Sequence, residues 1–405
     1  MERMMPSEPR QVEPRHVVAE TRHVVALQTG QPDRLLLAVV GVLLMVGLQM
    51  VYSSSFGYAL TAYNDAAYLA LRQALWGAVG FSLLLLFSRV DYHIWRDLSL
   101  VVMVISVLAL IAVHLPVIGV SSYGATRWLR LGPLPPLQPS EFIKLPMIIY
   151  ISAWLTGRGD RLREFSAGLA PFIVLMGLVG GLIMLQPDLG TTVTILFTAM
   201  ALFFVAGASL RHLLVLICVA AVAGLLLVVG AEYRSGRIES FLDPWKDPQG
   251  KGFHIIQSLV AFGSGGFWGL GLGASRQKFF YVPGSHTDAI FAILGEELGF
   301  IGVVGVMALF AVLLYRGFRL SFRAPDQFGV LLASGITFWF TFQILINIGG
   351  ITKSIPFTGI PLPFLSYGGS SLAISMAAVG ILLNISKQAV DGGPSLWQRL
   401  RGRGP

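Results

Sequence analysis

Long apolar segments separated by shorter polar ones dominate the pattern along this chain. Ten such segments lie near residues 34–53, 68–88, 98–117, 140–156, 167–185, 189–207, 212–230, 288–315, 327–350 and 366–386. A helix rises about 1.5 Å per residue, so most of these segments are long enough to cross about 30 Å of hydrocarbon. None alternates as a membrane-spanning strand does. The pattern therefore predicts an all-α, polytopic membrane helix bundle with about ten transmembrane helices.

Composition supports a membrane protein and excludes an ordinary soluble domain. The chain is 55% hydrophobic and 12% charged, whereas soluble domains carry roughly 25% charged residues. Its net charge of +8 needs no nucleic-acid partner, because a basic fringe facing anionic lipid accounts for most of it. The single cysteine, Cys218, lies in an apolar run and indicates no disulfide framework.

The distribution of basic residues predicts the orientation. An even number of spans places both termini on one side, and most of the 29 Lys and Arg residues fall in segments on that side. By the positive-inside rule, both termini are cytoplasmic. Residues 1–33 lack the apolar core of a signal peptide and are expected to form a disordered cytoplasmic tail. Residues 388–405 are expected to form a second one, leaving 34–387 as the membrane domain.

One connection is much longer than the others. Residues 231–287, between the seventh and eighth spans, are predicted to form a large extracytoplasmic loop. The loop concentrates aromatic, cationic and small polar residues, and it ends at Asp288, the first residue of the next predicted span. A carboxylate at this position can cap the helix that follows. It can equally serve as a reactive group at the membrane edge.

Ionisable residues inside spans cost roughly 2.5–3.5 kcal/mol on insertion scales, so each needs an explanation. Glu141 and Lys144 are three residues apart and are predicted to form a structural ion pair on one helix face. Asp188 follows a proline and is expected to cap the next helix. Glu296 and Glu297 lie too deep for capping and require a polar cavity or a cationic partner.

Two further segments on the same side, 121–138 and 358–371, are rich in Pro, Gly and small hydroxylated residues. Irregular backbone at membrane depth is tolerated where it lines a cavity or is buried in protein. We therefore expect a polar cavity shared by these segments and the long loop, with ordinary tight turns as the alternative. The chain has no phosphate-binding lysine loop, zinc-type His-Glu-x-x-His motif or cysteine pair.

Taken together, several motifs resemble the SEDS (shape, elongation, division and sporulation) family. They are Gly124–Trp128, Gln138–Lys144, Gln186–Thr191, Phe241–Trp245, Gln257–Ser258, His286–Asp288, Gly295–Gly299, Thr358–Pro363 and Ser366–Ser371. The resemblance covers about residues 34–388. Within the family, residues 271–278 are more similar to the FtsW and SpoVE branch than to the RodA branch.

The resemblance implies a peptidoglycan glycosyltransferase that polymerises lipid II at the outer face of the bacterial cytoplasmic membrane. It would invert the anomeric centre, release undecaprenyl pyrophosphate from the growing glycan, and work with a class B penicillin-binding transpeptidase and other division proteins. The family's essential aspartate falls on Asp288, and its intramembrane Glu–Lys pair on Glu141 and Lys144. A role in septal synthesis is expected, with a RodA-like role in elongation left open.

Asp288 is the expected general base. The leaving pyrophosphate needs cations, for which the candidates are Arg72, Arg127, Arg276 and Lys278, with a divalent ion such as Mg or Mn left open. Arg72 can alternatively extend to the membrane interface. Trp128 and Trp245 are candidates for stacking on sugars or for interfacial anchoring. Further residues expected at the substrate are Gln257, Ser258, His286, Ser366 and Ser370, and the expected polar cavity includes Asp188, Glu296 and Glu297.

Two alternatives belong to other functional classes. A flippase or transporter for lipid-linked precursors would use the same cavity, but it would need polar lining in both halves of the bundle. The motifs cluster on one side, which favours the enzyme. A non-catalytic scaffold of the division machinery would retain its function without the Asp288 carboxylate.

Overall fold

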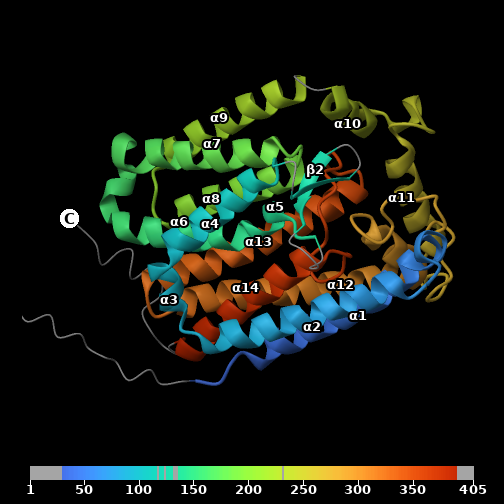
Figure 1. Ribbon diagram of the computed structural model, residues 1–405, viewed down its shortest axis with the longest axis horizontal. Helices are drawn as coiled ribbons and strands as arrows, with labels where there is room; N and C mark the ends of the chain where they lie inside the picture. Colours follow the sequence, from blue (N-terminus) through green and yellow to red (C-terminus); the bar gives the residue numbers. More distant parts are fainter. Residues whose placement is uncertain (1–29, 116–117, 123–124, 131–135, 230–231, 390–405) are drawn as a thin grey trace, which may run out of the picture.

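The protein is a bundle of long helices that share one axis (Figure 1). The computed structural model describes residues 30–115, 118–122, 125–130, 136–229 and 232–389. Within them, six helices are long and apolar enough to cross a membrane: α1 (Arg34–Tyr63), α2 (Tyr68–Arg89), Phe165–Met184, which contains α7 (Ala170–Met184), α12 (Ile290–Arg323), α13 (Gln327–Ile351) and α14 (Gly369–Gln388). Such helices confirm the predicted helical membrane bundle.

The other four predicted spans are also occupied by helices. Three are apolar, namely α4 (Ser99–Ala112), α8 (Leu189–Val205) and α9 (Leu210–Val229), and the fourth is α6 (Lys144–Arg158). Each of the ten predicted segments thus contains a helix, while the count of ten membrane crossings stays a prediction. Two predicted ends were too early, because α1 continues to Tyr63 and α12 to Arg323.

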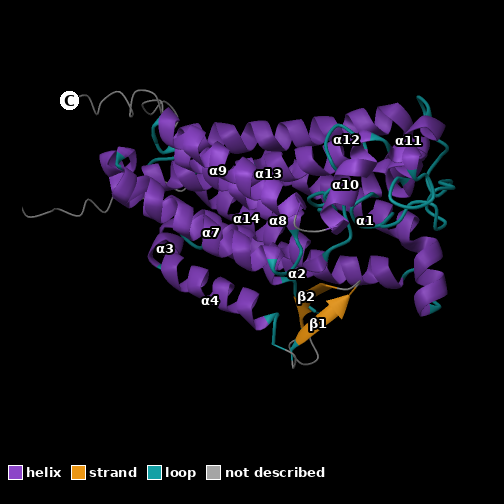
Figure 2. Cartoon of the chain, turned by 90° about the horizontal axis from the view of Figure 1, so that it is seen from above, coloured by secondary structure: helices purple, strands orange, loops and turns teal. Residues whose placement is uncertain are grey.

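Several short elements join these helices. They are α3 (Tyr92–Asp97), β1 (Gly119–Ser122), β2 (Ala125–Leu129), α5 (Pro139–Phe142), the 3-10 turn Gly159–Arg163, α10 (Glu232–Leu242), the 3-10 turn Pro244–Lys246 and α11 (Phe253–Gly265). The strands β1 and β2 pair antiparallel beside the bundle (Figure 2), a departure from the all-α prediction. The segment predicted as a long loop contains α10 and α11, which mark one end of the bundle.

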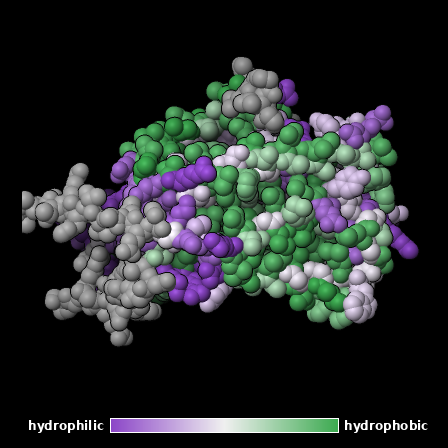
Figure 3. Space-filling view, turned by 90° about the horizontal axis from the view of Figure 1, so that it is seen from below, coloured by the Kyte–Doolittle hydropathy of each residue, from purple (hydrophilic) through white to green (hydrophobic). Residues whose placement is uncertain are grey.

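The interior of the bundle is formed by α13 and α14, whose side chains are mostly buried, whereas α12 is largely exposed on its apolar face. Glycines allow close helix packing here. A methyl group on Gly80 of α2 would lie 3.0 Å from Met376 of α14, and one on Gly380 would lie 2.6 Å from the carbonyl oxygen of Leu84. The exposed surface over α1 and α2 carries a broad apolar area across its middle, with hydrophilic residues toward both ends (Figure 3).

The segment between α13 and α14 returns into the bundle as irregular chain, and side chains satisfy its backbone. Gln73 of α2 donates to the carbonyl oxygen of Ser366 (3.1 Å) and accepts from the amide of Gly368 (3.2 Å). Asn347 and Gln343 of α13 donate to the carbonyl oxygens of Ile360 (2.7 Å) and Pro361 (2.8 Å). These bonds permit non-helical backbone inside a membrane bundle.

We predict that Gly47→Ala destabilises the protein by about 1–3 kcal/mol, because the new methyl group would collide with the carbonyl of Phe364. Thermal unfolding of the purified protein in detergent measures the change. The control is Gly41→Ala in the same helix, where a methyl group meets nothing within 4 Å. Equal unfolding temperatures for the two variants would contradict the prediction.

Candidate functional site

Asp288 lies immediately before α12, at the α10–α11 end of the bundle. Its side chain is partly exposed, and Oδ1 accepts a hydrogen bond from the Thr287 hydroxyl (2.9 Å). Its backbone oxygen accepts from Asn347 (2.8 Å), so the residue is tied to the interior helix α13. The first turn of α12 is preceded by Ala289 and has no side-chain cap. The capping role considered for Asp288 is therefore wrong.

Two glycines leave the Asp288 carboxylate accessible. A methyl group on Gly284 would collide with Oδ1, and one on Gly359 would lie 3.3 Å from Oδ2. Both glycines have positive φ (65° and 76°), a conformation that other residues rarely adopt. The backbone on both sides of the carboxylate thus approaches closely only because these positions carry no side chain.

Arg237 of α10 and His254 of α11 complete the surroundings of Asp288, and the sequence did not single out either. Arg237 donates through Nη1 to the carbonyl oxygens of Phe357 (3.2 Å) and Thr358 (3.0 Å). The methyl position on Gly359 lies 3.9 Å from its Nη2 as well as close to Asp288. The His254 ring lies 4.1 Å from the Phe357 ring.

Burial lowers the pKa of His254, although the negative charge of Asp288 acts in the opposite direction. The imidazole is therefore neutral at pH 7, and the positive charge near Asp288 comes from Arg237. Arg237 and His254 lie far from Asp288 along the chain, and no spacing in the sequence connects them. Only the folding of α10 and α11 over the 357–359 segment brings the three together.

His286 joins the site to an aromatic wall. Its ring stacks on Tyr58 of α1 (5.2 Å between centroids) and meets the edge of Tyr367 (5.7 Å). Burial lowers the pKa of His286, opposed by Asp288. Arg72 lies close enough to act electrostatically on Tyr367. Two residues expected at the substrate, Arg72 and His286, thus both lie near the Tyr367 ring.

Three of the expected substrate-binding residues make hydrogen bonds to the backbone of the protein itself. Ser258 is buried and donates to the carbonyl of His254 (2.8 Å) within α11. Ser366 accepts from the amide of Leu362 (2.8 Å), and Ser370 accepts from that of Gln138 (3.2 Å). Gln257 on α11 and Trp128 on β2 are half-buried, and Trp245 is exposed.

Arg127 and Asp188 together hold the turn between α7 and α8. The guanidinium of Arg127 donates to the carbonyl oxygens of Gln186 (2.8 Å) and Pro187 (2.7 Å). Asp188 caps α8 by accepting from the amide of Thr191 (3.0 Å), as the sequence predicted, and also accepts from Ser140 (3.0 Å). The geometry favours a structural role for Arg127 over the pyrophosphate contact expected from sequence.

Glu296 and Glu297 organise the 275–278 turn, which they hold against α12. Glu296 accepts from the Ser275 hydroxyl and from the amides of Arg276 (3.1 Å) and Gln277 (3.3 Å). Glu297 forms a buried ion pair with Lys278 (3.1 Å). Lys278 is thus the cationic partner of Glu297, whereas a hydroxyl and two amides satisfy Glu296. It is 4% exposed and already bonded, whereas the Arg276 side chain is exposed.

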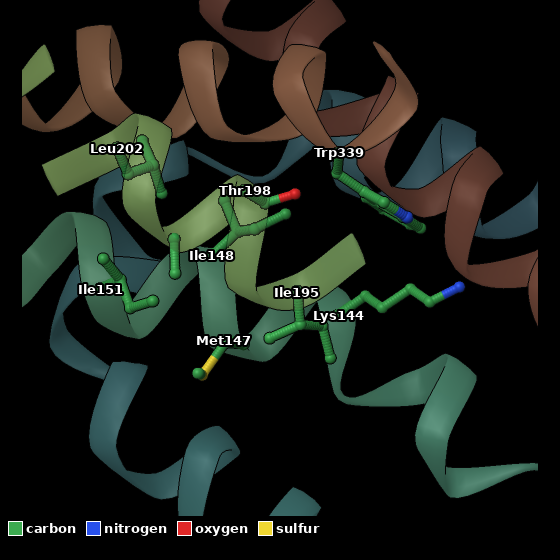
Figure 4. Close-up of a pocket in the computed structure, with 9 residues that line it drawn as sticks. Lys144, Met147, Ile148, Ile151, Ile195, Thr198, Leu202 and Trp339 are labelled. Carbon is green, nitrogen blue, oxygen red and sulfur yellow. The ribbon is translucent and has the colours of Figure 1, made fainter. Parts of the chain in front are cut away.

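The predicted ion pair of Glu141 and Lys144 is formed and almost fully buried, with 2.6 Å between Oε1 and Nζ. Lys144 also donates to Oε1 of Gln343 (3.2 Å), which accepts in addition from the indole of Trp339 (2.6 Å). Figure 4 shows the ammonium end of Lys144 directed away from a small apolar pocket of about 10 Å³ between α6, α8 and α13. The pair therefore locks α5 and α6 to α13.

A divalent ion was left open by the sequence. Within the residues that the structure describes, no group of three or more His, Cys, Asp or Glu side chains is placed to hold a metal ion. The positive charge that the structure places near Asp288 comes from Arg237.

Comparison with known proteins identifies a family and several relatives to which the chain is similar. The sequence profile of the family described as "Cell cycle protein", which groups FtsW, RodA and SpoVE, matches residues 33–391. Stage V sporulation protein E of Bacillus subtilis is 45% identical over 88% of this chain and 97% of its own length. A probable peptidoglycan glycosyltransferase FtsW of Trichlorobacter lovleyi is 44% identical over 87% of this chain and 93% of its own.

Two solved structures are similar over most of their length. One structure comes from work on the coordination of polymerization and crosslinking by a peptidoglycan synthase complex. It is 30% identical in sequence, with a TM-score of 0.71, and the match covers 88% of this chain and 97% of the chain in that structure. The other is the rod shape determining protein RodA of Thermus thermophilus, 29% identical, with a TM-score of 0.65, covering 89% and 98%.

We predict that Lys278→Met lowers the unfolding free energy by about 3–5 kcal/mol, because it leaves the Glu297 carboxylate buried without its cation. Thermal unfolding in detergent provides the measurement. Arg276→Met is the control, since it removes a neighbouring charge from an exposed side chain. If Lys278→Met unfolds like the wild type yet loses turnover of lipid II, the pyrophosphate contact expected from the sequence is correct instead.

Proposed function

Because the chain belongs to the cell cycle protein family of FtsW, RodA and SpoVE, we propose that it is a peptidoglycan glycosyltransferase. It polymerises lipid II into glycan strands and releases undecaprenyl pyrophosphate. The observation that carries the proposal is the Asp288 carboxylate, partly exposed between two glycines and beside Arg237 and His254. The similarity to proteins named as probable peptidoglycan glycosyltransferases supports it.

In the proposed reaction, a sugar hydroxyl of the acceptor attacks the anomeric carbon of the lipid-linked donor. The bond from that carbon to the pyrophosphate oxygen breaks, and the hydroxyl proton passes to Asp288. A positioned base contributes roughly 10²–10⁴-fold to such a step. Thr287 orients Oδ1, and attack opposite the leaving group inverts the anomeric centre. In the described part of the chain, Asp288 forms no ion pair that would have to break first.

The geometry changes which cations we propose to contact the leaving pyrophosphate. Lys278 and Arg127 are held by protein oxygens, so Arg276 and Arg72 remain from the predicted set. We add Arg237 as a positioning residue. It fixes the 357–359 segment against Asp288 and places positive charge beside the carboxylate.

We further propose the cellular arrangement. Both termini are cytoplasmic, the α10–α11 end faces outward from the bacterial cytoplasmic membrane, and residues 34–387 form the catalytic membrane domain. The excess of Lys and Arg on the terminal side supports this orientation. A class B penicillin-binding transpeptidase is the proposed partner, in septal synthesis, supported by the similar structure from a peptidoglycan synthase complex. The flippase alternative is not favoured, because the interior helices α13 and α14 are closely packed.

We predict that Asp288→Asn lowers lipid II polymerisation by at least about 10²-fold, because the amide cannot accept the hydroxyl proton. Membrane insertion and thermal stability should be unchanged, since the side chain is partly exposed. Gel analysis of glycan strands made by the purified protein with its transpeptidase provides the measurement. Asp65→Asn, at an exposed carboxylate in the α1–α2 turn, is the control. Normal strand synthesis by the Asp288 variant would point to a scaffold.

A second prediction concerns Arg237. Arg237→Met removes the guanidinium from the carbonyl oxygens of Phe357 and Thr358, so the 357–359 segment is no longer fixed beside Asp288 and kcat for polymerisation should fall by up to roughly 10²-fold. Arg237→Lys keeps the charge and should lower kcat less, because a single ammonium replaces the guanidinium on the two carbonyls. Unchanged strand synthesis by Arg237→Met would show that Arg237 does not position the segment.

A further inference from the structure

The segment that follows α11 carries an unusual number of exposed apolar side chains. We call this set the apolar rim; it comprises Phe267, Trp268, Leu270, Leu272, Phe279, Phe280 and Tyr281. Its members range from 41% exposed at Leu270 to 78% at Trp268. Apolar surface in water costs about 25 cal/mol per Å², so a patch of this kind indicates contact with lipid or with another protein.

The position of the apolar rim along the membrane normal follows from the contacts between α1 and α12. Asp33, which caps α1, forms an ion pair with Arg316 of α12. At the other end of the same pair of helices, Ser53 of α1 donates to Glu297 of α12 (2.6 Å). The two ties are about twenty residues apart along either helix, which corresponds to about 30 Å and to the thickness of the hydrocarbon core.

Between the two ties the pair of helices is apolar. The Arg316 end also carries Arg319, Arg323 and the exposed Tyr315, as expected at a membrane interface. The level of Ser53 and Glu297 is therefore the opposite boundary of the hydrocarbon. The number of residues from Asp33 to Ser53 in α1 and the number from Arg316 to Glu297 in α12 both place the boundary at this level.

The apolar rim is fixed at this boundary by backbone hydrogen bonds. The amides of Leu270 and Gly271 donate to the carbonyl oxygens of Glu296 and Glu297 (both 3.0 Å), and the amide of Phe300 donates to Gly266 (2.9 Å). Gly299 has a φ of 64°, and a methyl group there would collide with the backbone of Gly269. The loop thus lies directly on α12.

The exposed surface of α12 continues that of the rim. Phe267 stacks on Phe300 (5.7 Å between centroids), and the exposed face of α12 proceeds through Ile301 and Val304 into the apolar span. On the other side of the rim, the ring of Phe279 packs against Gly57 of α1. One unbroken apolar surface therefore runs from the membrane-spanning helices onto the loop.

We propose that the apolar rim inserts into the lipid leaflet on the Asp288 side, at the boundary between headgroups and acyl chains. The ligand of this surface is the phospholipid itself, since aromatic side chains favour that boundary. Ser285 donates to the carbonyl oxygen of Ser54 (3.2 Å) and His286 stacks on Tyr58, so the segment that carries Asp288 lies beside the turns of α1 that follow Ser53, just outside this boundary. The inference does not depend on the enzymatic activity.

The experiment places a spin label at either of two exposed tryptophans of the same segment between α9 and α12. In the full chain carrying Cys218→Ser, Trp268→Cys or Trp245→Cys is labelled with a nitroxide and reconstituted in phosphatidylcholine–phosphatidylglycerol nanodiscs. Trp245 is 66% exposed but lies between charged residues in the 3-10 turn Pro244–Lys246, so it is the matched control. Power-saturation spectroscopy then compares collisions with oxygen, which partitions into lipid, and with a water-soluble nickel chelate.

We expect a ratio of oxygen to nickel collisions that is several-fold higher at 268 than at 245. Equal nickel collisions at the two positions would overturn the proposal, because the rim would then lie in water. Protection from both reagents at 268 would also overturn it, since the rim would be packed against protein. Phe280→Cys, at a second exposed rim position, repeats the measurement if the Trp268 variant does not fold.

Discussion

The hydrogen bonds that side chains of the helices make to the segment between α13 and α14 support the whole site. This segment is not helical, yet it lies inside the bundle, where unsatisfied peptide groups would cost several kcal/mol each. Gln73, Gln343 and Asn347 supply the missing partners from α2 and α13. Because Asn347 also holds the backbone of Asp288, the same bonds position the carboxylate.

The fold was predictable to the extent that hydrophobicity alone determines it. Every predicted span contains a helix because twenty apolar residues in lipid have few other ways to satisfy their backbone. The β1–β2 hairpin was missed, since a few residues of alternating character beside a long span give no distinct signal. The ends of α1 and α12 were misjudged because protein contacts, such as those of Tyr58 with His286 and of Ser321 with the carbonyl of Val330, stabilise their extra turns.

Local relations within the site were also predictable, whereas long-range relations were not. The Glu141–Lys144 pair and the Asp188 cap follow from a spacing of three or four residues and from the turn before α8. Lys278 was assigned to the substrate because its partner Glu297 lies on another element and nothing in the sequence joins them. Arg237 and His254 were overlooked for the same reason, since they approach Asp288 only after α10 and α11 fold over the site.

The two ties between α1 and α12 have a mechanical consequence. Antiparallel helices joined at both ends cannot slide past one another, so the apolar length of this helix pair is fixed. When the hydrocarbon layer is thicker or thinner than this length, the bilayer deforms or the helices tilt, which costs fractions of a kcal/mol per Å of mismatch. Acyl-chain length, rather than any change within the protein, then determines where the lipid surface lies relative to the Asp288 end of the bundle.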